Sequence, residues 1–228
     1  MTFILAIQLE DSIVIAADTR STIPHQNNGS YLYQDGIQKL FPWENGIITG
    51  TGELNLIQNV IYSFNKVNKN SIDELPDLLK ASKLRREQEI THSQLEITKL
   101  LYSTYRKNGA QIYSIQPNKL EEYEVIRCEK NEILLWTFNP NIHPIINALT
   151  ELYSSLKPLK VFNNMADCIY YYLNQISPIF RKQAQHDSMM SKEFNFFFQT
   201  KDEYFFGEYL NNDSGILNNK INTWQSKT

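Results

Sequence analysis

The first residue with suggestive chemistry is Thr2, which directly follows the initiator Met1. Because threonine is small, the methionine before it is commonly removed, and removal leaves the Thr2 hydroxyl beside a free α-amine. An α-amine titrates at about pH 7.7 to 8.0, so a good fraction is neutral near pH 7 and can accept the hydroxyl proton. Thr2 could therefore act as a nucleophile that carries its own base. A threonine at position 2 is commonplace, so this interpretation depends on its context.

Four features of the first 52 residues provide that context. They are an apolar segment that starts at Thr2, the sequence SIVIAADTR at residues 12–20, the pair Lys39-Leu40 before a strand pattern, and the turn Gly50-Thr51-Gly52 before a helical pattern. Together these motifs resemble the proteasome β-subunit family, whose members are N-terminal-nucleophile (Ntn) hydrolases. The combination is far more specific than Thr2 alone.

The resemblance implies roles for three residues. Thr2 would be the nucleophile, Lys39 a catalytic cation, and Asp18 the carboxylate beside it. Elementary electrostatics agrees, because a buried ammonium needs a carboxylate partner and its charge favours the neutral form of a nearby amine. The alternative is an Asp18–Lys39 ion pair that serves only the core, since such pairs also occur without catalysis.

A second group of residues would face the substrate. Backbone N–H groups of Gly50-Thr51-Gly52 could bind a developing oxyanion, because glycine lets the main chain approach a substrate closely. Arg20, which ends the SIVIAADTR motif, is placed with them as a substrate-binding candidate. The alternative for the glycines is a tight turn that only precedes the next helix.

The resemblance continues at residues 186–191, after the last long helix, with one departure before that point. The family places an Asp and a Ser near the nucleophile after the last long helix, where this sequence has Asp187 and either Ser188 or Ser191. Ser191 is the better match, although a polar loop after a helix is the plain alternative. The expected Gly-Ser-Gly turn is replaced by LWTFNPN at residues 135–141, which puts classical peptidase activity in doubt.

The elements that would position these residues follow from hydrophobic periodicity. Period-two or continuous apolar runs predict strands, and apolar residues at helical spacing predict helices. The expected strands cover residues 3–9, 12–17, 38–43, 46–51, 95–105, 110–115, 120–126, 133–137, 194–199 and 203–210. One expected helix starts after Glu53. The others cover residues 72–86, with Ser71 as N-cap, 144–156, and 165–185, where Pro178 would kink the helix or end a turn.

The resulting order is β, αα, β, αα, β, which favours the α+β class. Two antiparallel sheets can stack with a helical layer outside each, as a four-layer αββα sandwich, and the resemblance gives this architecture the name Ntn-hydrolase fold. No low-complexity linker or internal repeat divides the sequence, so we expect one domain over residues 1–210 and a polar C-terminal tail over 211–228. The segment 21–33 is expected to be a long loop of unknown purpose.

Composition excludes several classes of function. Lys and Arg total 22 against 25 Asp and Glu, a net charge of −3, so the basic excess of a nucleic-acid-binding protein is missing. Cys128 and Cys168 lack neighbours at metal-ligand spacing, and His25, His92 and His143 lack convergent ligands. No signal peptide or membrane-spanning run is recognised. We expect a soluble cytoplasmic protein with no cofactor or metal and no nucleic-acid or membrane partner.

The sequence as a whole predicts a proteasome-like threonine hydrolase that cleaves a peptide or amide bond. Two alternatives stay open: a catalytically silent subunit of the same fold that assembles or binds, favoured by residues 135–141, and an amidase for a small metabolite. Family members stack their helical layers into rings, so the resemblance implies a homo-oligomer. Tyr170, Tyr171 and Tyr172 point around more than half of the last long helix, which would suit such contacts, or a helix covered within its own fold.

Overall fold

A computed structural model describes residues 2–24, 31–66, 71–90, 93–107, 109–120, 122–211 and 220–224. Two antiparallel sheets and a separate hairpin contain the strands. The larger sheet has the order β10-β1-β2-β11-β12-β13. Its strands, in chain order, are β1 (Ile4–Gln8), β2 (Ile13–Asp18), β10 (Glu132–Trp136), β11 (Phe194–Gln199), β12 (Tyr204–Tyr209) and β13 (Lys220–Trp224).

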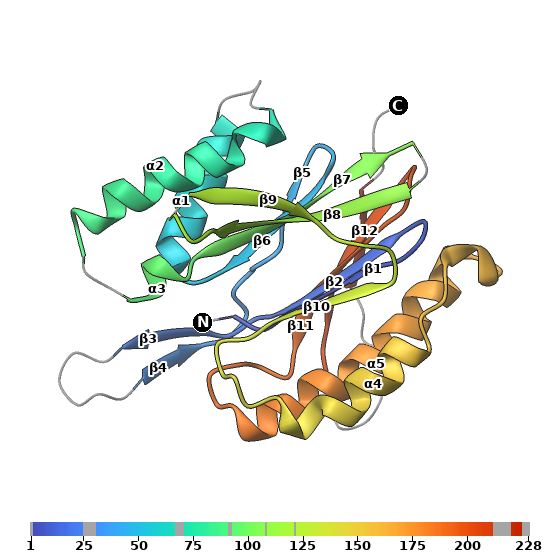
Figure 1. Ribbon diagram of the computed structural model, residues 1–228. Helices are drawn as coiled ribbons and strands as arrows, with labels where there is room; N and C mark the ends of the chain where they lie inside the picture. Colours follow the sequence, from blue (N-terminus) through green and yellow to red (C-terminus); the bar gives the residue numbers. More distant parts are fainter. Residues whose placement is uncertain are drawn as a thin grey trace.

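The smaller sheet has the order β5-β6-β7-β8-β9. It consists of β5 (Phe41–Trp43), β6 (Gly46–Thr51), β7 (Lys99–Arg106), β8 (Gly109–Pro117) and β9 (Tyr123–Arg127). The separate hairpin pairs β3 (Ser21–Pro24) with β4 (Tyr31–Gln34) and extends from the end of the sheets at which the chain starts (Figure 1).

The helices form two groups, one against each sheet (Figure 1). The first group contains α1 (Leu54–Lys66), the 3-10 turn η1 (Ile72–Glu74), α2 (Leu75–Glu87) and the short α3 (Ser93–Glu96). The second contains η2 (His143–Ile145), α4 (Ile146–Ser154), η3 (Leu159–Val161) and α5 (Met165–His186). No helix in the described part of the chain is both long and apolar enough to cross a membrane.

Strand β1 shows how the core is divided. Leu5 and Ile7 belong to a buried cluster that includes side chains of α4 and α5, whereas the alternate residues Ile4 and Ala6 belong to a second cluster shared with Ile112 and other residues of the smaller sheet. Successive side chains of a strand point to opposite faces, so both faces of β1 are covered by protein. A third cluster joins the outer face of the smaller sheet to α1 and α2. The predicted α+β class with antiparallel sheets is confirmed.

Two expected elements differ from the observed ones near the first helical group. Residues 95–98 were predicted to start a strand, but α3 and a turn occupy them, and β7 starts only at Lys99. Thr98 donates its hydroxyl to the Gln94 carbonyl at 2.6 Å, which holds the turn, and Leu95 is buried beneath it. A short apolar run has no period that separates a strand from a buried turn. The segment 21–33, predicted as a loop, contains β3 and the start of β4.

Helix α5 runs past Pro178 to His186, and its neighbours Ile176, Ile179 and Phe180 are fully buried, so that packing offsets the lost hydrogen bond. The kink expected at Pro178 stays a prediction. One further difference concerns the C-terminal part. The predicted tail 211–228 also takes part in the fold. Asn211 is buried and exchanges hydrogen bonds with Ser177, and β13 pairs with β12 at the sheet edge.

Candidate active site

The hairpin of β1 and β2 brings the start of the chain to Asp18. Ile4 lies opposite Ala17 in the antiparallel register, so Phe3 lies opposite Asp18. The Phe3 N–H donates to Asp18 Oδ1 at 2.8 Å, and the Asp18 N–H donates to the Phe3 carbonyl at 3.0 Å. Thr2, which precedes Phe3 and has only 8% of its surface exposed, is thereby fixed beside this carboxylate by the backbone.

Asp18 ties four segments of the chain together. Its Oδ1 accepts from the Phe3 N–H and from Lys39 Nζ at 2.7 Å. Its Oδ2 accepts from the Arg20 N–H at 3.0 Å and from the Ser191 N–H at 3.4 Å. The side chain has no exposed surface. A fully buried carboxylate is stable only with such partners, so the folded state depends on these four contacts of Asp18.

Lys39 is the cation of a buried ion pair with Asp18. Only 3% of its side chain is exposed, and Thr49 on β6 donates its hydroxyl to the Lys39 carbonyl at 2.7 Å. Burial lowers the pKa of Lys39 below its ordinary value, while the charge and hydrogen bond of Asp18 oppose that change. The structure thus brings three of the predicted residues, Thr2, Asp18 and Lys39, to one place.

Ser191 joins this group from the segment after α5. Its Oγ accepts from the Thr19 N–H at 2.8 Å and donates to the Glu193 carbonyl at 2.8 Å, and it lies 3.0 Å from Thr19 Oγ1. Of the two serines weighed in the sequence, Ser191 contacts Asp18, whereas the carbonyl of Ser188 accepts from Arg20 Nη1 at 2.8 Å. Ser191 therefore lies against the end of β2.

Asp187 turns toward its own loop. It ends α5, with its N–H donating to the Gln183 carbonyl at 2.9 Å, and its Oδ1 accepts from the Met189 N–H at 2.9 Å. Within the described residues, no hydrogen bond links the Asp187 side chain to Asp18 or Lys39. The catalytic role inferred for Asp187 stays a prediction.

Arg20 holds the β3–β4 hairpin against the segment after α5. Its Nε and Nη2 donate to the two carboxylate oxygens of Asp35 at 2.7 and 2.8 Å, and its guanidinium lies 5.2 Å from the centre of the Tyr33 ring. The hydrogen bond with Asp35 raises the pKa of Arg20, and the pKa of Asp35 is lowered in turn. Asp35 was not identified in the sequence, because its role depends on a hairpin that was expected to be a loop.

The Gly50-Thr51-Gly52 turn packs tightly against the start of β7. Gly52 has φ of +119°, and a Cβ there would lie 2.3 Å from Thr98 Oγ1; a Cβ at Gly50 would lie 2.7 Å from the Lys99 carbonyl. After the turn, Glu53 accepts from the Leu56 N–H at 2.6 Å and so satisfies a free N–H at the start of α1. This close packing explains why glycine is needed at positions 50 and 52, and a role in binding an oxyanion stays a prediction.

A cavity of about 390 Å³ opens at this same end of the sheets. The residue opposite Ile4 on β10 is Trp136, so Thr137 and Phe138 follow beside the start of β1. The cavity is lined by Thr51, Glu96, Ile97, Lys99, Gln116, Pro117, Thr137 and Phe138. It connects the glycine turn with the altered segment 135–141.

Lys99 lines this cavity and was not identified as a site residue in the sequence. Its Nζ lies 4.3 Å from the centre of the Trp136 ring, and burial lowers its pKa. It pairs with Thr51 across β6 and β7, a neighbour relation that follows only from the strand register. No motif in the sequence pointed to it.

The altered segment 135–141 is folded on itself. Thr137 donates its hydroxyl to the Asn139 carbonyl at 2.9 Å, and Asn139 Oδ1 accepts from the Asn141 N–H at 3.0 Å. Thr137 carries the only side-chain hydroxyl in the sequence LWTFNPN, and this hydroxyl is directed to its own turn. His143 follows as the first residue of η2, while Met1, His25 and His92 lie outside the described residues.

Comparison with known proteins identifies the fold. No family model matches the sequence, and no curated protein matches it either. Solved structures do match, among them an Anbu (Gly-1) mutant from Hyphomicrobium sp. strain MC1, with a TM-score of 0.59 and 13% identity over 86% of this chain and 82% of that one. Anbu, described as an ancestral β-subunit, from Yersinia bercovieri has a TM-score of 0.57 and 14% identity over 86% and 80%.

Eukaryotic HslV from Trypanosoma brucei matches with a TM-score of 0.50 and 14% identity, over 86% of this chain and 98% of that one. These proteins have proteasome-type Ntn-hydrolase folds, and the present chain shares that fold. The resemblance found in the sequence is confirmed at the level of the fold.

Proposed function

We propose that this protein is a threonine hydrolase that cleaves a peptide or amide bond with Thr2, once Met1 has been removed. The observation that carries the proposal is the shared oxygen Asp18 Oδ1, which accepts both the N–H directly after Thr2 and the ammonium of Lys39. A buried cation held this close to the start of the chain acts on the α-amine of Thr2. A buried ion pair is not needed for stability alone, because apolar side chains of similar volume often replace such a pair without loss of stability.

The reaction starts with attack of Thr2 Oγ on the substrate carbonyl. The α-amine of Thr2 accepts the hydroxyl proton and passes it to the leaving amine, so that an ester between Thr2 and the acyl group forms as the amide bond breaks. Water then cleaves the ester with the same amine as base. The positive charge of Lys39 disfavours protonation of this amine and keeps it able to accept a proton near neutral pH.

The other predicted residues take supporting positions in this scheme. Backbone N–H groups of Gly50-Thr51-Gly52 would face the oxyanion, and Asp187 and Ser191 would orient the Thr2 amine from the segment after α5. Arg20 would hold the edge of the substrate site through the β3–β4 hairpin. The cavity between Thr51 and Thr137 would accept one side chain of the substrate.

We further propose the architecture and the assembly. The three core clusters support a four-layer αββα sandwich as a single domain, which covers residues 1–210 and to which β13 adds an edge strand. A cytoplasmic homo-oligomer would use the helices at 144–156 and 165–185, where Ile146, Tyr153 and Tyr170 are exposed. Tyr171 and Tyr172 serve the fold itself, because their hydroxyls donate to the Ser155 and Lys157 carbonyls.

One observation favours a second candidate, a catalytically silent subunit of the same fold. The hydroxyl of Thr137 donates to Asn139, so the wall of the site beside β10 offers no free hydroxyl from this residue. An amidase for a small metabolite would share the Thr2 chemistry and differ only in what the cavity of about 390 Å³ accepts.

The test combines mass with chemistry. The intact mass of protein purified from its native host shows whether Met1 is absent, and a β-lactone probe should then acylate Thr2, as located by peptide mapping. Thr2→Ala should abolish acylation, while Thr150→Ala, an exposed threonine on α4, should leave it unchanged. A mass that retains Met1 would remove the free amine and favour the silent subunit.

A further inference from the structure

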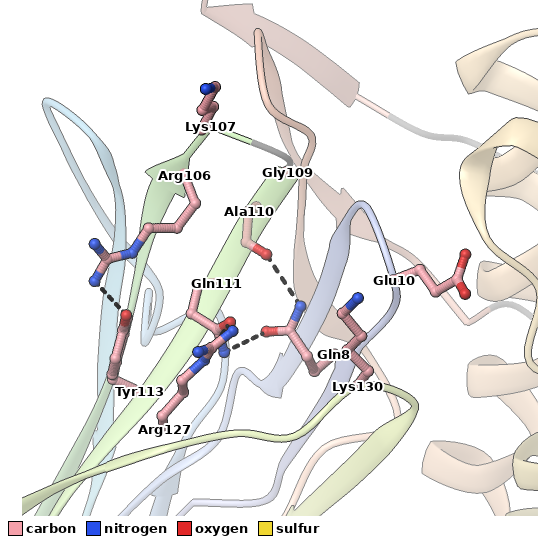
Figure 2. A pocket seen from close by; sticks show the side chains of 10 residues that line it. All are labelled: Gln8, Glu10, Arg106, Lys107, Gly109, Ala110, Gln111, Tyr113, Arg127 and Lys130. Atoms are coloured by element: carbon pink, nitrogen blue, oxygen red, sulfur yellow. Dashed lines mark hydrogen bonds between the residues drawn. The ribbon is translucent and has the colours of Figure 1, made fainter.

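A larger pocket of about 490 Å³ lies at the opposite end of the sheets from Thr2. Its lining residues come from the end of β1, from the β7–β8 hairpin and from the segment between β9 and β10. Figure 1 shows these three segments together at one end of the sheets. Among its lining residues, Gln8 and Gln111 are nearly buried and form the inner part, and the side chains of Arg106, Lys107, Arg127 and Lys130 surround it (Figure 2). None of these residues takes part in the proposed hydrolysis.

The charge around this pocket is strongly positive. It is lined by four cationic side chains and one carboxylate, that of Glu10. Glu10 points away from the others in Figure 2 and pairs with Lys160 at 2.6 Å. The hydrogen bond from Lys160 is the main cause of the lowered pKa of Glu10, and Lys130 adds only a weaker attraction. Within the described part of the chain, no ion pair involves any of the four cations.

Two neighbouring acidic side chains accept hydrogen bonds from the backbone. Asp11 accepts from the backbone N–H groups of Leu159 and Lys160, and Glu132 accepts from the Glu129 N–H at 2.6 Å. Four cationic side chains and one carboxylate therefore line the pocket, which is a local excess of positive charge. Such an arrangement raises the local potential and attracts anions.

Polar contacts hold the pocket in shape. Gln8 Oε1 accepts from the Ile112 N–H at 2.8 Å and from Gln111 Nε2 at 3.1 Å, and Gln8 Nε2 donates to the Ala110 carbonyl at 3.0 Å. Gln111 Oε1 in turn accepts from Arg127 Nε at 2.9 Å. The glutamine pair therefore fixes the direction of the Arg127 guanidinium (Figure 2).

Arg106 is held in a similar way. It donates to the hydroxyl of Tyr113, and its guanidinium lies 5.3 Å from the centre of the same ring. Two guanidinium groups with fixed orientation are suited to phosphate oxygens, which they bind through parallel N–H donors, and lysines add point charges. Ala110 is the one aliphatic side chain among the residues that line the pocket, so an apolar ligand would find few contacts there.

We infer that this pocket binds a small phosphorylated polyanion. A ligand with two or more phosphate groups neutralises several of the four cations at once, which a single carboxylate cannot do. The site lies at the far end of β1 from Thr2 and does not depend on hydrolase activity. A ligand bound here would contact the β1–β2 hairpin, because Gln8 lies on β1. The same hairpin carries Asp18 on β2.

Titration calorimetry with inorganic tripolyphosphate at low ionic strength tests the inference on the full chain. We expect micromolar binding that weakens as salt is added. Lys107→Gln/Lys130→Gln should weaken it by about tenfold or more, since two of the charges are lost. Neither lysine belongs to the glutamine network, so the pocket keeps its shape, and the thermal melt of the variant provides the check on folding.

A matched control is Lys80→Gln/Lys182→Gln, which removes two exposed charges on α2 and α5 and should leave the affinity within about twofold. Inorganic monophosphate should bind more weakly than tripolyphosphate. Equal affinity in the pocket variant and the control variant would overturn the site, as would absence of binding to the wild-type protein. Tighter binding of a hexaglutamate peptide than of tripolyphosphate would overturn the ligand class and point to an acidic peptide.

Discussion

The two ends of strand β1 handle charge in opposite ways. At the start, Asp18 and Lys39 are buried together, and the carboxylate is surrounded by four N–H donors. At the other end, four cations stand in solvent around a pocket without a carboxylate partner among the described ion pairs. A buried pair cannot lose one member without leaving an uncompensated charge, whereas exposed cations are screened by water and salt. The first end is therefore fixed by folding, and the second is available for a ligand.

At the buried end of β1, hydrolytic activity should be the property most sensitive to substitution. Thr2→Ala should reduce hydrolysis of a peptide or amide substrate by at least about 10³-fold, because the nucleophile is lost. The free energy of unfolding should change by less than about 1 kcal/mol, since one hydroxyl and one methyl group are removed. Turnover of a fluorogenic peptide amide, followed alongside urea unfolding, separates the two readouts. Wild-type turnover in purified Thr2→Ala protein would exclude Thr2 as the nucleophile.

The next effect is on stability at the same end. Asp18→Ala should lower the free energy of unfolding by about 3–5 kcal/mol, because it leaves the Lys39 ammonium buried without its carboxylate. The matched control is Asp35→Ala, which breaks the ion pair with Arg20 at a carboxylate that is 51% exposed and should cost no more than about 1 kcal/mol.

Urea unfolding monitored by circular dichroism measures both variants. Adding Lys39→Met to Asp18→Ala should recover part of the loss, since the buried ammonium that lost the Asp18 carboxylate is then removed as well. Equal destabilisation by Asp18→Ala and Asp35→Ala would contradict the contrast between a buried and an exposed charge.

A smaller effect is expected at the glycine turn beside the cavity. Gly52→Ala should cost about 1–3 kcal/mol, because Gly52 has a left-handed φ and the new Cβ would meet Thr98. Gly36→Ala is the control: its φ is +78°, but no atom lies within 4 Å of the added Cβ, so only backbone strain remains. Thermal melts of the two variants separate the strain from the contact with Thr98. A melting temperature of Gly52→Ala equal to that of the wild-type protein would show that the turn has room for a Cβ at this position.

The sequence predicted the buried end better than the exposed end. The hairpin from residue 3 to residue 17 follows from two apolar runs, and the resemblance to the proteasome β-subunit family implied that Asp18 and Lys39 lie together. Ser191 was preferred to Ser188 for its spacing in the family's pattern; its N–H donates to Asp18, and its catalytic role stays a prediction. Motifs and strand pairing that are local in sequence are the parts that pattern reasoning can reach.

Relations that depend on register between distant strands could not be anticipated. Lys99 meets Thr51 and Trp136 only because β6, β7 and β10 are placed by the fold, and Arg20 finds Asp35 only through the β3–β4 hairpin. The basic pocket combines residues 8, 106–107, 127 and 130, none of which forms a charge run in the sequence. A net charge of −3 concealed a local excess of positive charge.

At the exposed end of β1, substitution should have little effect on the free energy of unfolding. Lys107→Gln/Lys130→Gln should change the free energy of unfolding by less than about 0.5 kcal/mol, because both side chains are exposed and no described ion pair depends on them. The sign should be stabilising at low salt, since removal of two like charges reduces repulsion with Arg106 and Arg127, and the difference should vanish near 1 M salt, where charges are screened within about 3 Å. Urea unfolding at the two salt concentrations measures both properties. A loss of several kcal/mol would mean that these lysines are structural, and the contrast between the two ends of β1 would fail.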